Sequence, residues 1–191
     1  MVVANMLDVI DLRRIGAPQA QMIGELLDAV WPKPGASAAT RAEKLCAVGR
    51  EEDWSDRQAP RSFVLFELGR VIAHAAIVPR RIRTSQGEMV VGALAMVCTD
   101  PSSRGRGLGE QVVRAALETV DRGDFVAALF QTSGRVAPFY QRLGCESVDN
   151  RFVNSLAEDP QANPFWDEVA MRYPAHGSWP EGEIDLLGPG F

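Results

Sequence analysis

A glycine-rich turn at residues 104–109 constrains the fold of this chain more than any other feature. The apolar run that ends at residues 97–99 leads into the turn, and an amphipathic helical pattern over Gly107–Arg122 follows it. Glycines let backbone N–H groups approach an anion closely, and a helix N-terminus adds partial positive charge. Arg104 and Arg106 can add charged hydrogen bonds to phosphate. The pattern therefore predicts a strand, a pyrophosphate-binding turn and a helix in succession.

Other phosphate motifs fit this turn less well. A Walker-type loop needs Gly-Lys-Ser/Thr after its glycines, which is absent here. A dinucleotide fingerprint needs a third glycine three residues after the second, where this chain has Glu110. A glycine-rich turn without any ligand remains the structural alternative.

The rest of the chain predicts further strands and helices from apolar periodicity and from proline and glycine stop signals. The expected strands cover Asp8–Ile15, Arg61–Leu68, Arg70–Arg83, Glu88–Thr99, Phe125–Gln131, Cys145–Ser155 and Asp167–Tyr173. The other expected helices are one opened by Pro18 and stopped by Trp31-Pro32-Lys33-Pro34-Gly35, then Ala38–Val48 and Arg135–Leu143. Gly49–Pro60 is expected to be a loop, and Pro174–Phe191 an irregular tail packed on the domain.

This order of elements predicts an α/β (α+β) fold. Three consecutive strands form an antiparallel meander, and the strand–helix–strand unit after it requires parallel pairing. We therefore expect a mixed, mostly antiparallel sheet of roughly seven strands with helices on both faces. The chain has 191 residues, and we expect residues 1–191 to form a single domain.

Composition bounds the class of protein. The chain is 46% hydrophobic and has no apolar run near the roughly 20 residues of a membrane helix. Its start carries Asp8 and lacks the pattern of a signal peptide. Three scattered cysteines form no disulfide framework or metal-type pair, so a cytoplasmic location and no metal are expected. The net charge of −5 argues against nucleic acid and suits a cationic substrate.

The segment Arg104-Gly105-Arg106-Gly107-Leu108-Gly109 resembles the Arg/Gln-x-x-Gly-x-Gly/Ala signature of the GCN5-related N-acetyltransferase (GNAT) superfamily. The resemblance implies acetyl-CoA as co-substrate, with its pyrophosphate on the backbone amides of Arg104–Gly109. It also implies that the strand end Val97-Cys98-Thr99 binds the pantetheine arm and the thioester carbonyl, through the backbone of Val97 and Thr99. Cys98 is not expected to form an acyl-enzyme, because no activating histidine or acid flanks it.

A second segment, residues 133–144, resembles the helix of this family that ends in Tyr-x-x-x-Gly, with Tyr140 and Gly144 at those positions. The resemblance implies that Tyr140 protonates the leaving thiolate. A phenol suits this role because its pKa of about 10 lies near that of a thiol, about 8.5. A buried tyrosine that anchors the helix is the alternative. Cys145 stands where the family usually has an aromatic residue.

The general base is not assigned by the sequence. The strand before the turn, residues 92–96, carries no acid or histidine, although many family members have one there. Candidates are His74, Glu67 and Glu88, or a water molecule. A histidine packed in the core or on a sheet face is the alternative for His74.

The acceptor is predicted only as an amine of a small molecule, with no membrane partner and with a homodimer expected from the family. Val71–Arg81 resembles a strand of aminoglycoside 2′-N-acetyltransferases, although Ala95 replaces their central acid. The tail 179–191 resembles the ends of nodulation N-acyltransferases, and both likenesses suggest an amino-sugar-like acceptor. The tail could fold over the acceptor cleft and offer a stacking face and carboxylates to a cation, from Trp179, Glu181, Glu183 and Asp185. The alternative is that it only covers an apolar edge. Trp31 and Trp54 could line the acceptor pocket or simply pack.

Two other functions stay open at this point. One is a CoA-binding sensor or interaction module with little catalysis. The other is an N-acyltransferase that uses longer acyl chains.

Overall fold

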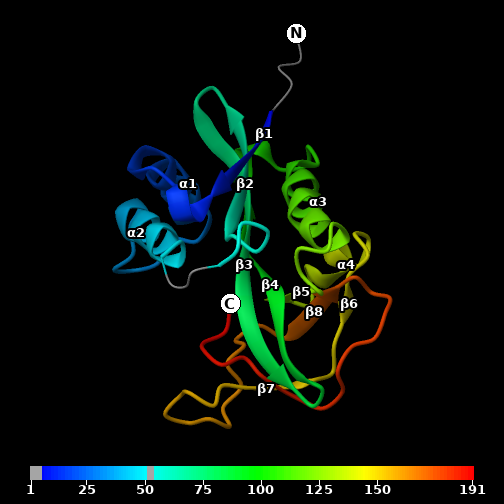
Figure 1. Ribbon diagram of the computed structural model, residues 1–191. Coiled ribbons are helices and arrows are strands. Elements are labelled where there is room, and N and C mark those ends of the chain that lie inside the picture. The colour runs from blue at the N-terminus through cyan, green and yellow to red at the C-terminus, as the bar shows by residue number, and fades with distance from the viewer. Residues whose placement is uncertain (1–5, 51–53) are drawn as a thin grey trace. The chain divides into compact units, whose positions relative to one another are not determined.

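The computed structural model describes residues 6–50 and 54–191, which divide into two compact units (Figure 1). The first unit holds the described residues up to Val78 together with Ala95–Glu118. The second unit holds Pro79–Leu94 and Thr119–Phe191. Two long strands and one helix continue from one unit into the other, and each unit is described separately below.

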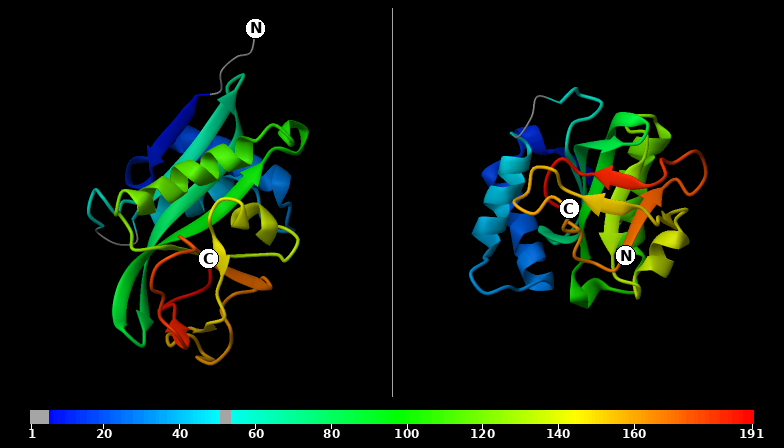
Figure 2. Two further views of the ribbon diagram at one scale, coloured as in Figure 1. Left: turned by 90° about the vertical axis from the view of Figure 1, so that its right-hand side faces the viewer. Right: turned by 90° about the horizontal axis from the view of Figure 1, so that it is seen from below.

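The first unit contains four strands, three α-helices and two short 3₁₀ helices, some of them in part. They are β1 (Leu7–Asp11), η1 (Leu12–Arg14), α1 (Ala17–Val30), α2 (Ala38–Val48), β2 (Arg61–Glu67), the start of β3 (Arg70–Thr84), the end of β4 (Gly87–Thr99), η2 (Pro101–Ser103) and most of α3 (Leu108–Asp121). The strands lie in the order β1-β2-β3-β4. In this unit α1 and α2 cover one face of the strands and α3 covers the other (Figures 1 and 2).

Helices α1 and α2 pack closely because small residues face each other. A Cβ atom on Gly24 would lie 2.2 Å from the carbonyl oxygen of Ala38, so only glycine fits there. Helix α2 begins at Ser37, whose hydroxyl accepts from the Thr40 N–H at 3.3 Å, while the Ser37 N–H donates to Thr40 Oγ1 at 2.9 Å. The apolar stripe of α1 then joins the core of this unit. That core consists of Ile10, Leu12, Ile23, Leu26, Leu27, Leu45, Val64, Val71 and Cys98.

The hairpin between β2 and β3 turns through two residues with left-handed backbone, Leu68 (φ 49°) and Gly69 (φ 77°). Two successive positive φ values are typical of the type I′ turn, whose twist matches that of antiparallel strands. The predicted tight connection at Gly69 is therefore confirmed. The antiparallel register runs from Arg61 opposite Ile77 to Glu67 opposite Arg70.

The second unit contains the remaining strands and a short helix. They are the end of β3, the start of β4, β5 (Ala128–Thr132), α4 (Ala137–Gln141), β6 (Glu146–Ser147), β7 (Arg151–Val153), β8 (Val169–Tyr173) and β9 (Glu183–Asp185). Its main path is β4-β5-β8-β6, and β9 pairs with both β7 and β3. A second core fills this unit. It is formed by Ile82, Val91, Ala127, Leu129, Phe152, Phe165, Ile184 and Leu186.

The predicted fold class is confirmed, since the strands pair mostly antiparallel and helices accompany them. Parallel pairing occurs between β4 and β5, as the strand–helix–strand unit requires, and between β7 and β9. The described chain has nine strands rather than seven. No helix within residues 6–50 and 54–191 is long and apolar enough to cross a membrane.

Four expected elements differ from the structure. The first strand ends at Asp11, because the Asp11 carboxylate accepts from the Arg13 N–H and starts a 3₁₀ turn. The expected strand 145–155 is two short strands, β6 and β7. Helix α4 is shorter than 135–143 because Pro138, which lacks an N–H, belongs in the first turn of a helix.

The tail is the fourth difference, because part of it is regular. Glu183–Asp185 forms β9, which pairs in parallel with Arg151–Val153 and places Ile184 in the second core. The expected loop Gly49–Pro60 contains residues 51–53, which lie outside the described residues, and its other residues form no helix or strand.

Candidate active site

The glycine turn is held at its base by Asp100. The Asp100 N–H donates to the carbonyl of Ile72 at 2.9 Å, which fixes the end of β4 to β3. The Asp100 carboxylate accepts from the Ser102 N–H at 2.9 Å and caps η2. Beyond η2, Gly105 (φ 78°) and Gly107 (φ 73°) have left-handed backbone, and a Cβ at either would meet no atom within 4 Å. The turn therefore presents backbone next to open space.

The N-terminus of α3 adds backbone donors to this turn. Its first described hydrogen bond runs from the Gln111 N–H to the Gly107 carbonyl at 3.2 Å. The N–H groups of Leu108, Gly109 and Glu110 precede this bond and have no acceptor in the described part of the chain. A Cβ on Gly109 would lie 3.2 Å from Thr99 Oγ1, so glycine allows a close approach to β4. This arrangement can hold an anion.

The two arginines of the turn differ in their partners. Arg106 donates to the Glu67 carboxylate at 2.7 and 3.3 Å, and this hydrogen bond lowers the pKa of Glu67. The exposed Arg104 has no hydrogen bond or ion pair with any residue that the structure describes. Arg104 is thus available to a phosphate, whereas Arg106 must exchange Glu67 for one.

The end of β4 combines a buried side chain with a backbone edge. Cys98 is 6% exposed within the first core, and burial raises the pKa of its thiol to about 12. A neutral, enclosed thiol is a poor nucleophile, which agrees with the prediction against an acyl-enzyme. The described parallel ladder with β5 covers only Gly92 and Ala93, so it leaves the backbone edge at Val97–Thr99 unused.

His74 is fully buried and both of its ring nitrogens are hydrogen-bonded. Nδ1 lies 2.8 Å from the carbonyl oxygen of Met96, and Nε2 lies 2.8 Å from Ser62 Oγ. Because a carbonyl can only accept, Nδ1 carries the proton and Nε2 accepts from the Ser62 hydroxyl. Burial lowers the pKa of His74 to about 4. His74 is therefore not the general base, and the core alternative is correct.

The two glutamate candidates for the base are ion-paired and lie in different units. Glu67 binds Arg106 in the first unit, and Glu88 lies 3.1 Å from Arg83 in the second. Because a bound phosphate would take Arg106 from Glu67, this pairing does not exclude Glu67, and the base stays unassigned between Glu67, Glu88 and water.

Tyr140 lies in the second unit, on α4. Its side chain is buried, and its ring centroid lies 4.6 Å from that of Phe130 and 5.0 Å from that of Phe139. The structure thus brings together the predicted residues of β4 and the turn in the first unit, while the role of Tyr140 stays a prediction. Trp31 and Trp54 belong to the first unit, and their role also stays a prediction.

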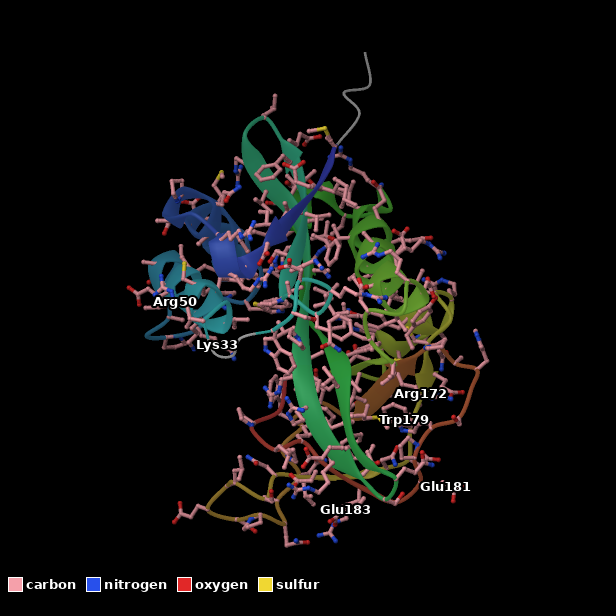
Figure 3. All side chains as sticks on the ribbon, viewed as in Figure 1. Lys33, Arg50, Arg172, Trp179, Glu181 and Glu183 are labelled. Carbon is pink, nitrogen blue, oxygen red and sulfur yellow. The ribbon has the colours of Figure 1, made fainter. Side chains whose placement is uncertain are left out.

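The predicted tail residues have separate roles in the second unit. Trp179 and Glu181 line a pocket together with Arg172. Figure 3 labels these three residues on the ribbon. Glu183 forms an ion pair with Arg151 at 3.4 Å, and Asp185 is buried.

The hydrogen bond between His74 and the carbonyl of Met96 could not be found from the sequence, since Met96 has φ 53° and nothing in its side chain favours that backbone. No cluster of His, Cys, Asp and Glu that could hold a metal ion occurs among the described residues.

Comparison with known proteins gives a family. A family model described as an acetyltransferase (GNAT) domain matches residues 11–148, which is most of the chain. A search of curated proteins finds no match.

Solved structures share the fold. GNAT family N-acetyltransferase YhbS from Escherichia coli, in complex with CoA, is 20% identical with a TM-score of 0.63, over 97% of this chain and 94% of that one. A GNAT family acetyltransferase from Brucella melitensis, in complex with acetyl-CoA, is 16% identical with a TM-score of 0.59, over 95% and 96%. Glucosamine-6-phosphate N-acetyltransferase from Arabidopsis thaliana is 15% identical with a TM-score of 0.58, over 75% and 94%. In two other matches this chain spans 34% and 33% of the solved chain.

Proposed function

Since this chain belongs to the GNAT acetyltransferase domain family, we propose that it transfers an acetyl group from acetyl-CoA to an amine of a small molecule. The observation that carries the proposal is the turn after β4. Its two glycines with positive φ, open space and unpaired N–H groups at the start of α3 suit a pyrophosphate. Structures of similar fold from Escherichia coli and Brucella melitensis hold CoA and acetyl-CoA.

The residues of the chain have distinct roles in this proposal. Backbone amides of Arg104–Gly109 hold the pyrophosphate, and the side chain of Arg104 adds positive charge. The backbone at Val97–Thr99 binds the pantetheine arm and polarises the thioester carbonyl. The hydrogen bond from His74 to the carbonyl of Met96 supports this role, because it fixes the irregular backbone just before Val97.

The reaction is a direct transfer. The neutral amine nitrogen attacks the carbonyl carbon, an N–C bond forms and the C–S bond breaks. Tyr140 gives its proton to the departing thiolate. The amine loses its own proton to a water molecule. The phenolate of Tyr140 then recovers a proton from solvent.

The acceptor in this proposal is an amino-sugar-like amine. The net charge of −5 favours a cation over an anion in the encounter. One protein of similar fold is a glucosamine-6-phosphate N-acetyltransferase from Arabidopsis thaliana. An amine on a sugar is therefore the first class of acceptor to screen.

The test of the co-substrate is calorimetric binding of acetyl-CoA to a Gly107→Glu variant. The new carboxylate would occupy the space that the pyrophosphate needs, so affinity should fall at least about tenfold. Gly35→Glu is the matched control, because Gly35 also has positive φ (77°, against 73° at Gly107) and open space around its Cβ position. Equal binding by wild type and Gly107→Glu, or none by folded wild type, would overturn the proposal.

Tyr140→Phe tests whether the chain catalyses or only senses CoA. Loss of a general acid should lower kcat by about 100-fold while acetyl-CoA binding is unchanged. Turnover is measured with acetyl-CoA and with a long-chain acyl-CoA, which also tests the longer-chain alternative. Unchanged kcat would remove Tyr140 from the mechanism, and a wild type that binds but never turns over would be a sensor.

A further inference from the structure

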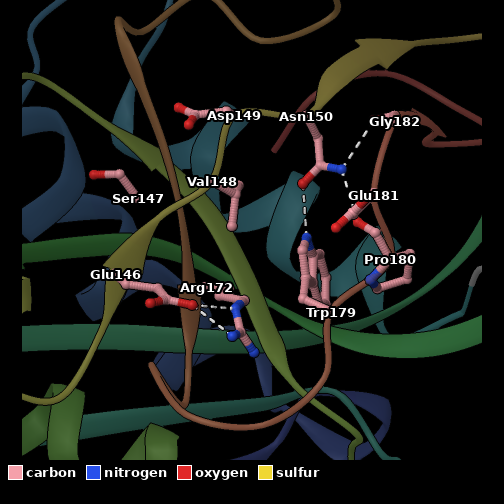
Figure 4. A pocket seen from close by; sticks show the side chains of 10 residues that line it. All are labelled: Glu146, Ser147, Val148, Asp149, Asn150, Arg172, Trp179, Pro180, Glu181 and Gly182. Carbon is pink, nitrogen blue, oxygen red and sulfur yellow. Dashed lines mark hydrogen bonds and ion pairs between the residues drawn. The ribbon is translucent and has the colours of Figure 1, made fainter.

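The second unit contains a surface pocket of about 320 Å³, a volume suited to a small ligand. Three segments line it: residues 146–150 after α4, Arg172 of β8, and residues 179–182 of the tail. Figure 4 shows the indole of Trp179 standing between Arg172 on one side and Asn150 on the other. The pocket thus exists only because the tail returns to β6 and β8.

The indole wall of the pocket is fixed by Asn150. The Asn150 Oδ1 accepts from Trp179 Nε1 at 2.7 Å, and its Nδ2 donates to the carbonyls of Pro180 and Gly182, both at 2.9 Å. These bonds use the amide of Asn150 and the indole N–H fully. The Arg172 guanidinium carbon lies 5.5 Å from the centroid of the Trp179 ring, so a ligand can use only the part of the ring that Arg172 leaves open.

Arg172 contributes a buried donor without an acceptor. Its side chain is only 7% exposed, with Nε donating to Glu146 at 2.7 Å and Nη2 to Glu146 and the Gly177 carbonyl. Its Nη1 has no acceptor among the residues that the structure describes. A buried N–H group is normally paired, so this donor calls for an oxygen atom from outside the chain.

The charge around the pocket is negative. Glu146 is matched by Arg172, but Asp149 and Glu181 are exposed and have no ion pair within the described chain. Unpaired carboxylates favour an organic cation over an anion, because they attract positive charge. They disfavour a carboxylate or phosphate ligand by the same argument.

We propose that this pocket binds a small hydroxylated organic amine, such as an amino sugar. Its ammonium group lies at Glu181, a hydroxyl oxygen accepts from Arg172 Nη1, and its C–H face packs on the part of the Trp179 ring that Arg172 leaves open. This binding goes beyond the proposed acetyl transfer and does not depend on it, because every group involved belongs to the second unit.

The experiment is titration of the protein with glucosamine, in the absence of acetyl-CoA, followed by the Trp179 indole N–H signal in ¹H–¹⁵N spectra. Trp179→Phe assigns that signal. N-acetylglucosamine is the matched neutral probe, since it keeps the ring and hydroxyls but lacks the charge. Glucosamine should shift the signal and bind about tenfold more tightly than the neutral sugar. Absence of a shift, or equal affinity for both sugars, would overturn the proposal.

Surface variants complete the test without disturbing the core. Glu181→Gln should weaken glucosamine binding by about three- to tenfold and leave the weak binding of N-acetylglucosamine unchanged. Glu158→Gln is the control, because Glu158 is also exposed in this unit but does not line the pocket. Equal effects of the two variants would mean that the amine is attracted only by overall charge, and the site would be rejected.

Discussion

His74 uses both ring nitrogens to fix backbone and side chains inside the first unit. Its Nδ1 proton goes to the carbonyl of Met96, whose φ of 53° is unfavourable for a side chain of this kind. The strain of such a residue persists only where its surroundings hold it. The histidine is therefore a positioning residue for the end of β4, and its acid–base chemistry is suppressed by burial.

This burial predicts a dependence of stability on pH. The pKa of His74 is about 4 in the folded chain and near 6.5 when it is unfolded, so the unfolded state binds the extra proton as pH falls. Stability is full above pH 6.5 and is lost between pH 6.5 and 4. From pH 7 to pH 5 the contribution of His74 falls by about 2 kcal/mol.

Urea unfolding of wild type and of a His74→Gln variant at pH 7 and pH 5 measures this loss of stability. The variant is less stable at pH 7, but its loss on going to pH 5 should be smaller than that of wild type by about 2 kcal/mol. The chain has one other histidine, the exposed His176, and His176→Gln should keep the wild-type loss. A His74→Gln loss as large as that of wild type would contradict the assignment.

At the scale of elements, β9 depends on one buried carboxylate. The Asp185 Oδ1 accepts from the N–H groups of Ser155 and Leu187, both at 3.0 Å, and Oδ2 lies 3.5 Å from Arg83 Nη1. Burial acts to raise the pKa of Asp185, but these bonds and the charge of Arg83 hold it below its usual value. One side chain thus joins β9 to β3 and to the segment after β7.

Asp185→Ala should lower the free energy of unfolding by about 2–3 kcal/mol, because two part-buried N–H groups lose a charged acceptor. Glu183→Ala on the same strand is the control and should cost no more than about 0.5 kcal/mol, since its ion pair with Arg151 is exposed. If both variants lost the same free energy of unfolding in urea, the Asp185 carboxylate would have no special stabilising role.

The sequence predicted elements well where their signals are local. The bounds of α2 agree with the predicted Ala38–Val48, and in the structure Ser37 caps the start of this helix. Prediction was wrong for β9, because Pro- and Gly-rich neighbours hide a three-residue strand. Its only reason to form is the long-range pairing with Arg151–Val153, which no local pattern encodes.

At the scale of the whole molecule, the parts of the candidate site also divide into those with a local sequence signal and those formed by distant residues. The turn at residues 104–109 is contiguous, so its glycines and the following helix could be recognised directly. The contacts of His74 with Ser62 and Met96 join residues 12 and 22 positions apart. The pocket at Trp179 needs three separate segments, and the family match ends at residue 148, before the tail begins.

The open glycines at 105 and 107 also bear on adaptation to heat. Each leaves the unfolded chain more freedom than a residue with a side chain would, at a cost of roughly 0.5–1 kcal/mol. No atom crowds either Cβ position, but the positive φ at both residues favours glycine, so a side chain there would strain the backbone. A lineage selected for growth at high temperature should therefore replace exposed glycines elsewhere first and keep these two, where a side chain would take the place of the ligand.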